Sequence, residues 1–171
     1  MIEMPVLYVC CSLVQIKSNN AGWEKMRGTI LSSTGNGNIT QSSFWGYCLM
    51  HKLTADLRRK QQIFHEDGAN VSMLRVIMAD GTCANVLYRL MRWFAERRLS
   101  PVAYLCYQLN KLLNGCVIGV GADFGPGFVL MHPVGVVINS KVRGETNITL
   151  ESGVVIGDEK GHSPVLGSDI F

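Results

Sequence analysis

Large apolar residues recur at every sixth position through the last third of the chain, with one break at Lys160. They are Ile118, Phe124, Leu130, Val136, Val142, Ile148, Val154 and Leu166. Neither the 3.6-residue period of a helix nor the two-residue period of a strand gives this spacing, whereas a β-helix with three flat sides and one hexapeptide per side does. A second, mostly small row stands two residues earlier, with Phe128 as its one large member: Cys116, Ala122, Phe128, Val134, Ser140, Thr146, Ser152 and Pro164. We predict that both rows line the interior of a parallel β-helix over residues 116–171, in about three coils.

Helical patterns precede the repeat and predict helices over residues 54–65, 71–78, 82–98 and 100–114. Ser100 is the expected N-cap of the last helix, Pro101 its first residue, and Gly115 its stop signal. The fold class is therefore α+β, with a poorly patterned extension (1–50), an α-helical domain (51–115) and the β-helix (116–171). The last hexapeptide would leave an open core end, so we expect a fragment or an early-terminated form of a longer protein.

The helix over residues 82–98 is expected to bury one apolar stripe and to expose its arginines. The buried stripe is predicted to be Val86, Leu87, Leu90, Met91 and Phe94. Arg89, like Asp56 on the first helix, is assigned to a solvated charged face. The predicted apolar face of the last helix is Val102, Leu105, Leu109, Leu112 and Leu113.

Composition excludes several function classes. A net charge of +3, from 16 basic and 13 acidic residues without a basic block, argues against nucleic-acid binding. The apolar run from Pro5 to Ile16 is too short for a membrane span and makes a poor signal peptide. Six cysteines without metal-ligand spacing indicate packed free thiols in a reducing compartment, so we expect a cytoplasmic protein with no metal site.

His132 is the strongest catalytic candidate from the residues alone. It stands two positions after Leu130 and two before Val134, both expected to point inward, so it should lie on a corner of the coil. An exposed imidazole titrates near neutral pH and can accept a hydroxyl proton as a general base. An ordinary surface histidine is the alternative interpretation.

Helices followed by hexapeptide coils, with the runs LYRLMRWF (87–94), HPVGVVI (132–138) and GVVIGD (153–158), resemble the serine acetyltransferase family. The resemblance covers residues 53–171 and implies left-handed β-helices assembled as homotrimers or dimers of trimers. It also implies acetyl-CoA as co-substrate, His132 as the base that deprotonates the acceptor hydroxyl, and an oxyanion and cofactor contact around Gly157 and Asp158.

Several positions depart from the family pattern. The aspartate that orients the histidine corresponds to Val117, and the aspartate that helps hold the serine amino group corresponds to Met131. If Pro164 sets the register of the loop, His162 replaces the family's arginine and Ser163 its second histidine; in another alignment His162 stands for that histidine. Met131, His162 and Ser163 are thus the candidate substrate-binding residues, although His162 also fits an exposed loop position.

These departures leave three functions open. The first is transfer of acetyl to L-serine, as in cysteine biosynthesis. The second is a saccharide O-acetyltransferase acting in surface-polysaccharide modification, because a neutral acceptor needs no paired charges for an ammonium and a carboxylate. The third is a non-catalytic, truncated trimeric scaffold.

Overall fold

A computed structural model of the chain describes residues 41–171. The chain divides into two compact units, Met1–Cys48 and Leu49–Phe171, and the second carries the coils and every side-chain contact discussed below. The expectations for residues 1–40, including the apolar run from Pro5 to Ile16, lie outside the described residues.

Within residues 41–171, four helices precede the coils, as the sequence predicts: α3 (Gln41–Glu66), α4 (Met73–Ile77), α5 (Thr82–Glu96) and α6 (Ser100–Asn114). Helix α3 begins before its predicted start at Thr54. The stop signal at Gly115 is confirmed, because this residue takes the left-handed conformation with φ of 63°. The cap prediction is wrong at Ser100, since Leu99 is the N-cap of α6 and no side chain caps the helix.

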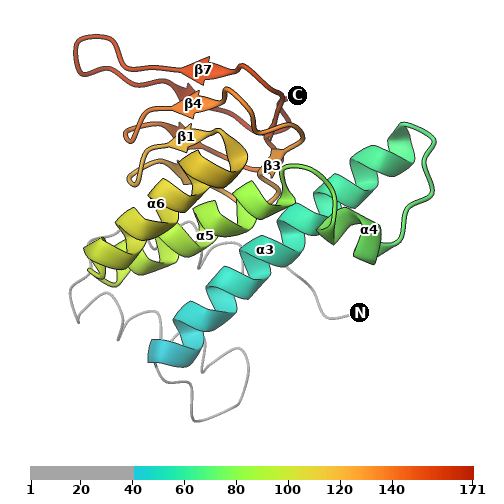
Figure 1. Cartoon of the computed structure of the whole chain (residues 1–171), viewed down its shortest axis with the longest axis horizontal. Helices are drawn as coiled ribbons and strands as arrows, with labels where there is room; N and C mark the ends of the chain where they lie inside the picture. Colours follow the sequence, from blue (N-terminus) through green and yellow to red (C-terminus); the bar gives the residue numbers. More distant parts are fainter. Residues whose placement is uncertain (1–40) are drawn as a thin grey trace. The chain divides into compact units, whose positions relative to one another are not determined.

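Residues 117–166 form short parallel strands that stack as coils, as Figure 1 shows. The strands are β1 (Val117–Ile118), β2 (Asp123–Phe124), β3 (Val129–Leu130), β4 (Val137–Ile138), β5 (Arg143–Gly144), β6 (Thr149–Leu150), β7 (Val155–Ile156) and β8 (Val165–Leu166). They make three sheets, β1-β4-β7, β2-β5-β8 and β3-β6. Each pair is parallel and joins strands that lie three places apart along the chain. The predicted three-sided parallel β-helix is confirmed.

The six-residue spacing does not continue unbroken through the coils, which corrects the prediction of one regular row. Val117 pairs with Val137, twenty residues later, so the first turn of the coil is two residues longer than three hexapeptides. The extra residues lie between β3 and β4, in residues 131–136. Beyond them Val136 stacks on the row of Cys116, while Ile138 continues the row of Ile118.

The predicted second inner row therefore holds only for the first coil, where Cys116, Ala122 and Phe128 are fully buried. Val134 is 65% exposed, and Ser140 and Ser152 also face solvent. The row is instead continued by Val136, Val142 and Ile148, all fully buried. A phase slip goes unseen in the sequence because both candidate positions after His132, Val136 and Ile138, are apolar.

Gly144 makes room inside the coils for the ring of Phe124, on which Phe128 stacks. Phe124 and Phe128 stack with ring centroids 4.2 Å apart, and Gly144 lies above Phe124 in the next coil. A Cβ at position 144 would stand 2.3 Å from Cδ1 of Phe124. At this position a glycine in one coil thus accommodates a large ring in the coil before it.

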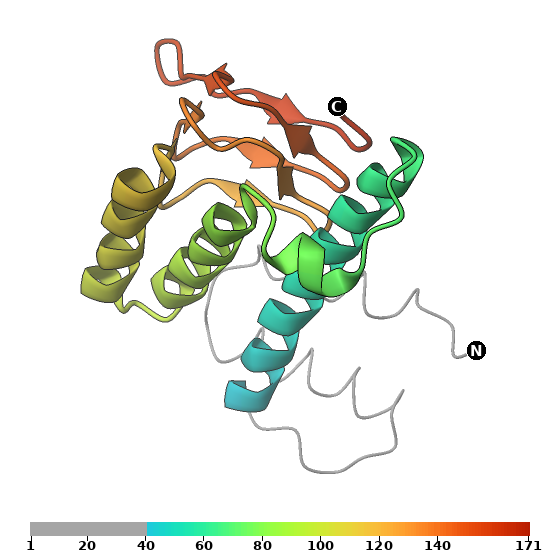
Figure 2. The same ribbon diagram turned by 45° about the vertical axis from the view of Figure 1, so that its right-hand side comes forward.

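Helices α5 and α6 lie at the β1–β3 end of the stack, with β7 and β8 at the other end, in both Figure 1 and Figure 2. Buried polar side chains of α5 bond the backbone of the first coil. The Tyr88 hydroxyl accepts from Phe124 N (3.0 Å), and Asn85 Oδ1 accepts from Leu130 N (2.8 Å). Helix α5 thereby satisfies strand groups that another coil would otherwise bond.

A buried ion pair corrects the predicted solvated charges of Asp56 and Arg89, which are 3% and 2% exposed. The Arg89 guanidinium donates to both Asp56 carboxylate oxygens (2.8 and 2.9 Å) and to the carbonyl oxygen of Phe124 (2.7 Å). Asp56 also accepts from the backbone N–H groups of Gly127 and Phe128 (2.9 Å each). Burial raises the pKa of the Asp56 carboxyl, and Arg89 and these two N–H groups oppose that shift. The pair fixes α3 and α5 to the corner between β2 and β3.

The predicted apolar face of α6 is wrong as well. Leu105, Leu112 and Leu113 are 57–79% exposed, whereas Ala103 and Cys106 pack into the core. On α5 the buried residues are Thr82, Ala84, Asn85, Tyr88, Arg89 and Met91. The predicted stripe is therefore correct at Met91, while Leu90 and Phe94 are partly buried against the core. Cys106 and Cys116 are buried free thiols, as predicted, and Cys83 is exposed. Within residues 41–171, no helix has the length and apolar character needed to cross a membrane.

Candidate active site

His132 lies in the six-residue loop between β3 and β4. Backbone hydrogen bonds hold this loop to the chain segments on either side of it in the stack. Met131 N–H donates to Leu150 O (3.0 Å), and Gly135 N–H donates to Gly115 O (3.0 Å). The side chain of His132 itself is 59% exposed. The structure thus places His132 at an outer corner as predicted, although the predicted inward neighbour Val134 points to solvent.

A carboxylate faces the imidazole from the helical part of the unit. Asp80 Oδ2 stands 3.0 Å from His132 Nδ1, while Asp80 Oδ1 accepts from the backbone N–H of Gly81 (3.0 Å). With the Nδ1 proton donated to Asp80, the second ring nitrogen, Nε2, carries the free lone pair that a general base requires. Sequence reasoning missed Asp80, because 52 residues separate it from His132.

The loop that carries Asp80 is packed tightly on the end of β3. Gly81 has φ of 76°, and a Cβ there would stand 2.1 Å from the carbonyl oxygen of Leu130. This contact requires glycine on both steric and conformational grounds. It fixes the Asp80 loop beside the strand from which the His132 loop departs.

Lys60 of α3 contacts both the Asp80 loop and the end of β3. Its ammonium donates to the backbone carbonyl oxygens of Asp80 and Leu130, the latter at 3.0 Å, and the residue is 3% exposed. Burial lowers the pKa of Lys60 to about 8, opposed by the negative charges of Asp80 and Glu151. A buried lysine at this place was also missed, because α3 reads as a polar helix.

The positions at which the family resemblance implies carboxylates hold apolar residues. Val117 is in β1 and pairs with Val137, and Met131 directly precedes His132. Asp80 therefore supplies the carboxylate that faces the His132 imidazole.

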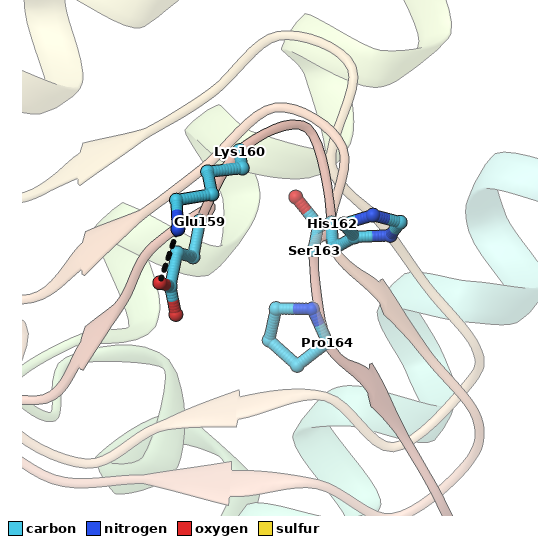
Figure 3. Close-up of a pocket in the computed structure, with 5 residues that line it drawn as sticks. All are labelled: Glu159, Lys160, His162, Ser163 and Pro164. Atoms are coloured by element: carbon cyan, nitrogen blue, oxygen red, sulfur yellow. Dashed lines mark ion pairs between the residues drawn. The ribbon is translucent and has the colours of Figure 1, made fainter.

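The other predicted site residues lie in the loop between β7 and β8, residues 157–164. Glu159, Lys160, His162, Ser163 and Pro164 line a shallow pocket there, and Figure 3 shows Glu159 and Lys160 across the loop from the other three. Glu159 and His162 bond each other through their backbones in an antiparallel bridge, and the His162 side chain is exposed. Lys141 Nζ lies 3.0 Å from Asp158 Oδ2. Asp158 Oδ1 and Ser163 Oγ are buried and make no hydrogen bond within the described residues.

Within one copy of the chain, His132 and the residues of the β7–β8 loop do not lie together. Strand β8 pairs with β5, so the loop of His162 stacks on residues 139–142. The loop of His132 instead stacks on residues 151–154, where Gly153 N–H donates to Val134 O (3.1 Å). His132 and Met131 therefore lie at one corner of the coils, and Gly157, Asp158, His162 and Ser163 lie at another. No cluster of three or more histidine, cysteine or acidic residues that could hold a metal occurs within residues 41–171.

Comparison with known proteins explains the arrangement of helices and coils. No family model matches the chain. It is 35% identical to a serine acetyltransferase of Synechococcus elongatus over 106 residues, which is 61% of this chain and 42% of that protein. It is 30% identical to a serine acetyltransferase of Helicobacter pylori over 115 residues, which is 64% of this chain and 67% of that protein. The chain belongs to the serine acetyltransferase family.

Solved serine acetyltransferases share the fold. The soybean enzyme complexed with serine aligns with a TM-score of 0.62 at 21% identity, over 71% of this chain and 51% of that one. A serine acetyltransferase in complex with CoA aligns with a TM-score of 0.57 at 18% identity, over 64% of this chain and 46% of that one. The left-handed parallel β-helix that the resemblance implies is confirmed by this agreement. This serine acetyltransferase homologue spans less than half of the cyanobacterial relative and about two thirds of the Helicobacter one.

Proposed function

We propose that this chain is an acetyl-CoA-dependent O-acetyltransferase that uses His132 as general base to acetylate the hydroxyl of L-serine. The observation that carries the proposal is the exposed His132 imidazole, whose Nδ1 faces a carboxylate at 3.0 Å so that Nε2 is left to accept a proton. Family membership supports both the acetyl donor and the acceptor, since relatives are named serine acetyltransferases.

In the proposed reaction, Nε2 of His132 takes the proton of the acceptor hydroxyl as its oxygen attacks the acetyl carbonyl of acetyl-CoA. The carbon–sulfur bond of the thioester then breaks, and the imidazolium returns the proton to the CoA thiolate. General-base catalysis of this kind contributes about 10²–10⁴ in rate. No metal takes part in the proposed reaction.

The donor is proposed to contact Gly157 and Asp158. Gly157 has open space around its Cα, so a ligand can approach the backbone closely there. Two buried oxygens of this loop, Asp158 Oδ1 and Ser163 Oγ, have no hydrogen-bond partner among the described residues. A backbone N–H near Gly157 would stabilise the negative charge that develops on the carbonyl oxygen.

The acceptor is proposed to contact Met131 beside His132, and His162 and Ser163 from another copy of the chain. A saccharide hydroxyl is the second candidate acceptor, because Met131 offers no charge to the ammonium group of an amino acid. The third candidate, a non-catalytic scaffold, predicts no acetyl transfer at all.

Assembly of copies is part of the proposal, because His132 and His162 lie at different corners of a single chain. A homotrimer, alone or paired as a dimer of trimers, would place the His162 loop of one copy beside the His132 corner of the next. The outward valines Val137 and Val155 on the β1-β4-β7 sheet, 41% and 68% exposed, supply apolar surface for such a contact. We place the protein in the cytoplasm, where acetyl-CoA and reduced thiols are both available.

The test measures thiol release from acetyl-CoA with L-serine, with a panel of sugars and without acceptor. The variants are His132→Ala and, as a matched exposed histidine on the helical part, His65→Ala. We expect acceptor-dependent release that falls at least about 100-fold in His132→Ala and is unchanged in His65→Ala. Full activity of His132→Ala would refute the base assignment, and preference for a sugar would replace serine as acceptor. No release with any acceptor would support the scaffold.

A further inference from the structure

Lys60 is a buried cation that the general-base reaction leaves without a role. It sits on α3 with two backbone carbonyl oxygens as acceptors, one from Asp80 and one from Leu130. The charged groups that face it are Asp80, in the loop before α5, and Glu151, which directly follows β6. Burying an ammonium group costs free energy unless the group is well hydrogen-bonded, so we expect Lys60 to have a structural or functional role.

The two carbonyl groups belong to the segments that carry the His132–Asp80 contact. Asp80 is itself the carboxylate residue, and Leu130 lies two residues before His132. One ammonium thus links the chain segments on both sides of the 3.0 Å contact. The close packing of Gly81 on Leu130 O holds the same two segments together by shape.

We propose that Asp80 is the positioning carboxylate of His132 and that Lys60 is a second positioning residue, which clamps the segments carrying both. The inference rests on the proposed function of His132 as general base. Neither residue touches the reacting atoms: Asp80 acts through His132, and Lys60 acts through the backbone of Asp80 and Leu130.

The physical role of Asp80 is to select one tautomer of the imidazole. A carboxylate is acceptor-only, so it holds the proton on Nδ1 and leaves Nε2 as the basic nitrogen. An asparagine at position 80 can instead donate its amide N–H to Nδ1, which places the proton on Nε2 and removes the base. In the catalytic triad of serine proteases, the corresponding aspartate-to-asparagine change keeps the geometry and lowers kcat about 10⁴-fold for this reason.

Asp80 also resolves the departure at Val117. The family resemblance implies an orienting carboxylate at position 117, where this chain has a β1 residue with an apolar side chain. Asp80 reaches the imidazole from the loop between α4 and α5 instead, and Lys60 compensates for the length of that route by fixing the loop to the end of β3.

The test combines ¹⁵N NMR of the His132 ring with acetyl-transfer kinetics on Asp80→Asn, Asp80→Ala and Lys60→Met. Asp67→Asn and Lys52→Met are the controls; Asp67 is an exposed aspartate in the loop after α3, and Lys52 lies on α3 and pairs with Asp123. Circular dichroism and urea midpoints select the pH and temperature at which every variant is folded. All measurements use the full chain.

In the wild-type chain, we expect the neutral His132 ring to carry its proton on Nδ1. Asp80→Asn should move the proton to Nε2 and lower kcat at least about 100-fold, with KM for acetyl-CoA within about twofold. Formate should restore part of the activity of Asp80→Ala, because the 62% exposed carboxylate leaves an open space for a small anion. Lys60→Met should populate both tautomers and lower kcat about 10-fold, while the two controls match the wild type.

A wild-type ring protonated on Nε2, or Asp80→Asn with unchanged tautomer and kcat, would overturn the role of Asp80. Lys60→Met with a wild-type tautomer and kcat would overturn the clamp. If the wild-type chain transfers no acetyl group, the proposed function fails, while the NMR arm still decides whether Asp80 and Lys60 position the imidazole.

Discussion

Adding one methyl group at Gly144 should destabilise the coils, because Phe124 of the preceding coil occupies the space that the methyl group would need. A Cβ at position 144 would lie 2.3 Å from Cδ1 and 2.7 Å from Cε1 of Phe124, and 2.6 Å from Cδ1 of Ile148. All three distances are shorter than van der Waals contact by about an ångström or more. Some part of the core must therefore move in Gly144→Ala.

Phe124 has little freedom to move away. Its ring stacks on Phe128 at 4.2 Å between centroids and meets Tyr88 edge-on at 6.0 Å, and all three residues are fully buried. Overpacking a well-filled core costs about 1–3 kcal/mol, and with two neighbouring side chains obstructed we expect about 2–3 kcal/mol here. The loss should lower the urea midpoint without a change in the m-value.

Gly167→Ala is the matched control, since a Cβ at position 167 meets nothing within 4 Å and neither glycine needs a positive φ. Both changes remove the same backbone freedom from the unfolded chain, so that contribution cancels in the comparison. The rescue is Phe124→Leu: in that background Gly144→Ala should cost at least about 1 kcal/mol less than in the wild type. Equal unfolding free energies for Gly144→Ala and Gly167→Ala, or no coupling to Phe124, would refute the stacking of glycine on phenylalanine.

Three further changes test the buried polar groups by urea unfolding. Asp56→Ala should lower the free energy of unfolding by about 3–5 kcal/mol, because it leaves the buried Arg89 guanidinium unpaired. As a control, Glu96→Ala breaks a partly exposed pair with Arg92 and should cost under about 1 kcal/mol. Similar losses in the two variants would contradict the burial of the Asp56–Arg89 pair. Tyr88→Phe should cost about 1–3 kcal/mol, because the buried Phe124 N–H loses its acceptor; a neutral change would show that this N–H finds another partner. Lys60 has a folded pKa of about 8 against 10.5 in the unfolded chain, so the unfolded state binds more protons between these values and stability rises with pH there. The wild type should therefore gain up to about 3 kcal/mol relative to Lys60→Met between pH 8 and 10.5, and a constant difference between the two would contradict the shifted pKa.

Local signals in the sequence were sufficient for the elements of the fold. Glycine at 115 stopped α6, and the six-residue spacing of apolar residues predicted a three-sided coil. Both signals act within a few residues along the chain, so no tertiary information is needed to read them. His132 could be placed at a corner because Leu130 points inward, although Val134, the other residue used in that argument, points to solvent.

The errors arose where a distant partner decides the outcome. Arg89 reads as a solvated charge on an amphipathic helix, yet Asp56, 33 residues earlier, pairs with it in the core. The α6 leucines read as a core face, but Ala103 and Cys106 let α6 approach α5 closely and leave the leucines outside. Asp80 and Lys60 carry no motif, and their roles depend on a chain crossing that only the folded structure defines.

The phase slip and the site have a common structural cause. Four residues connect β1 to β2, but six connect β3 to β4, and His132 lies in the longer connection. A four-residue corner stays close to the coil, as the buried Ala122 between β1 and β2 does. The two additional residues let the chain leave the coil far enough for the imidazole to meet Asp80 on the helical part before Val136 resumes the stack. The two additional residues of the β3–β4 loop thus help to join the coils to the helices at the proposed catalytic base, which is why a count of six along the sequence failed at His132.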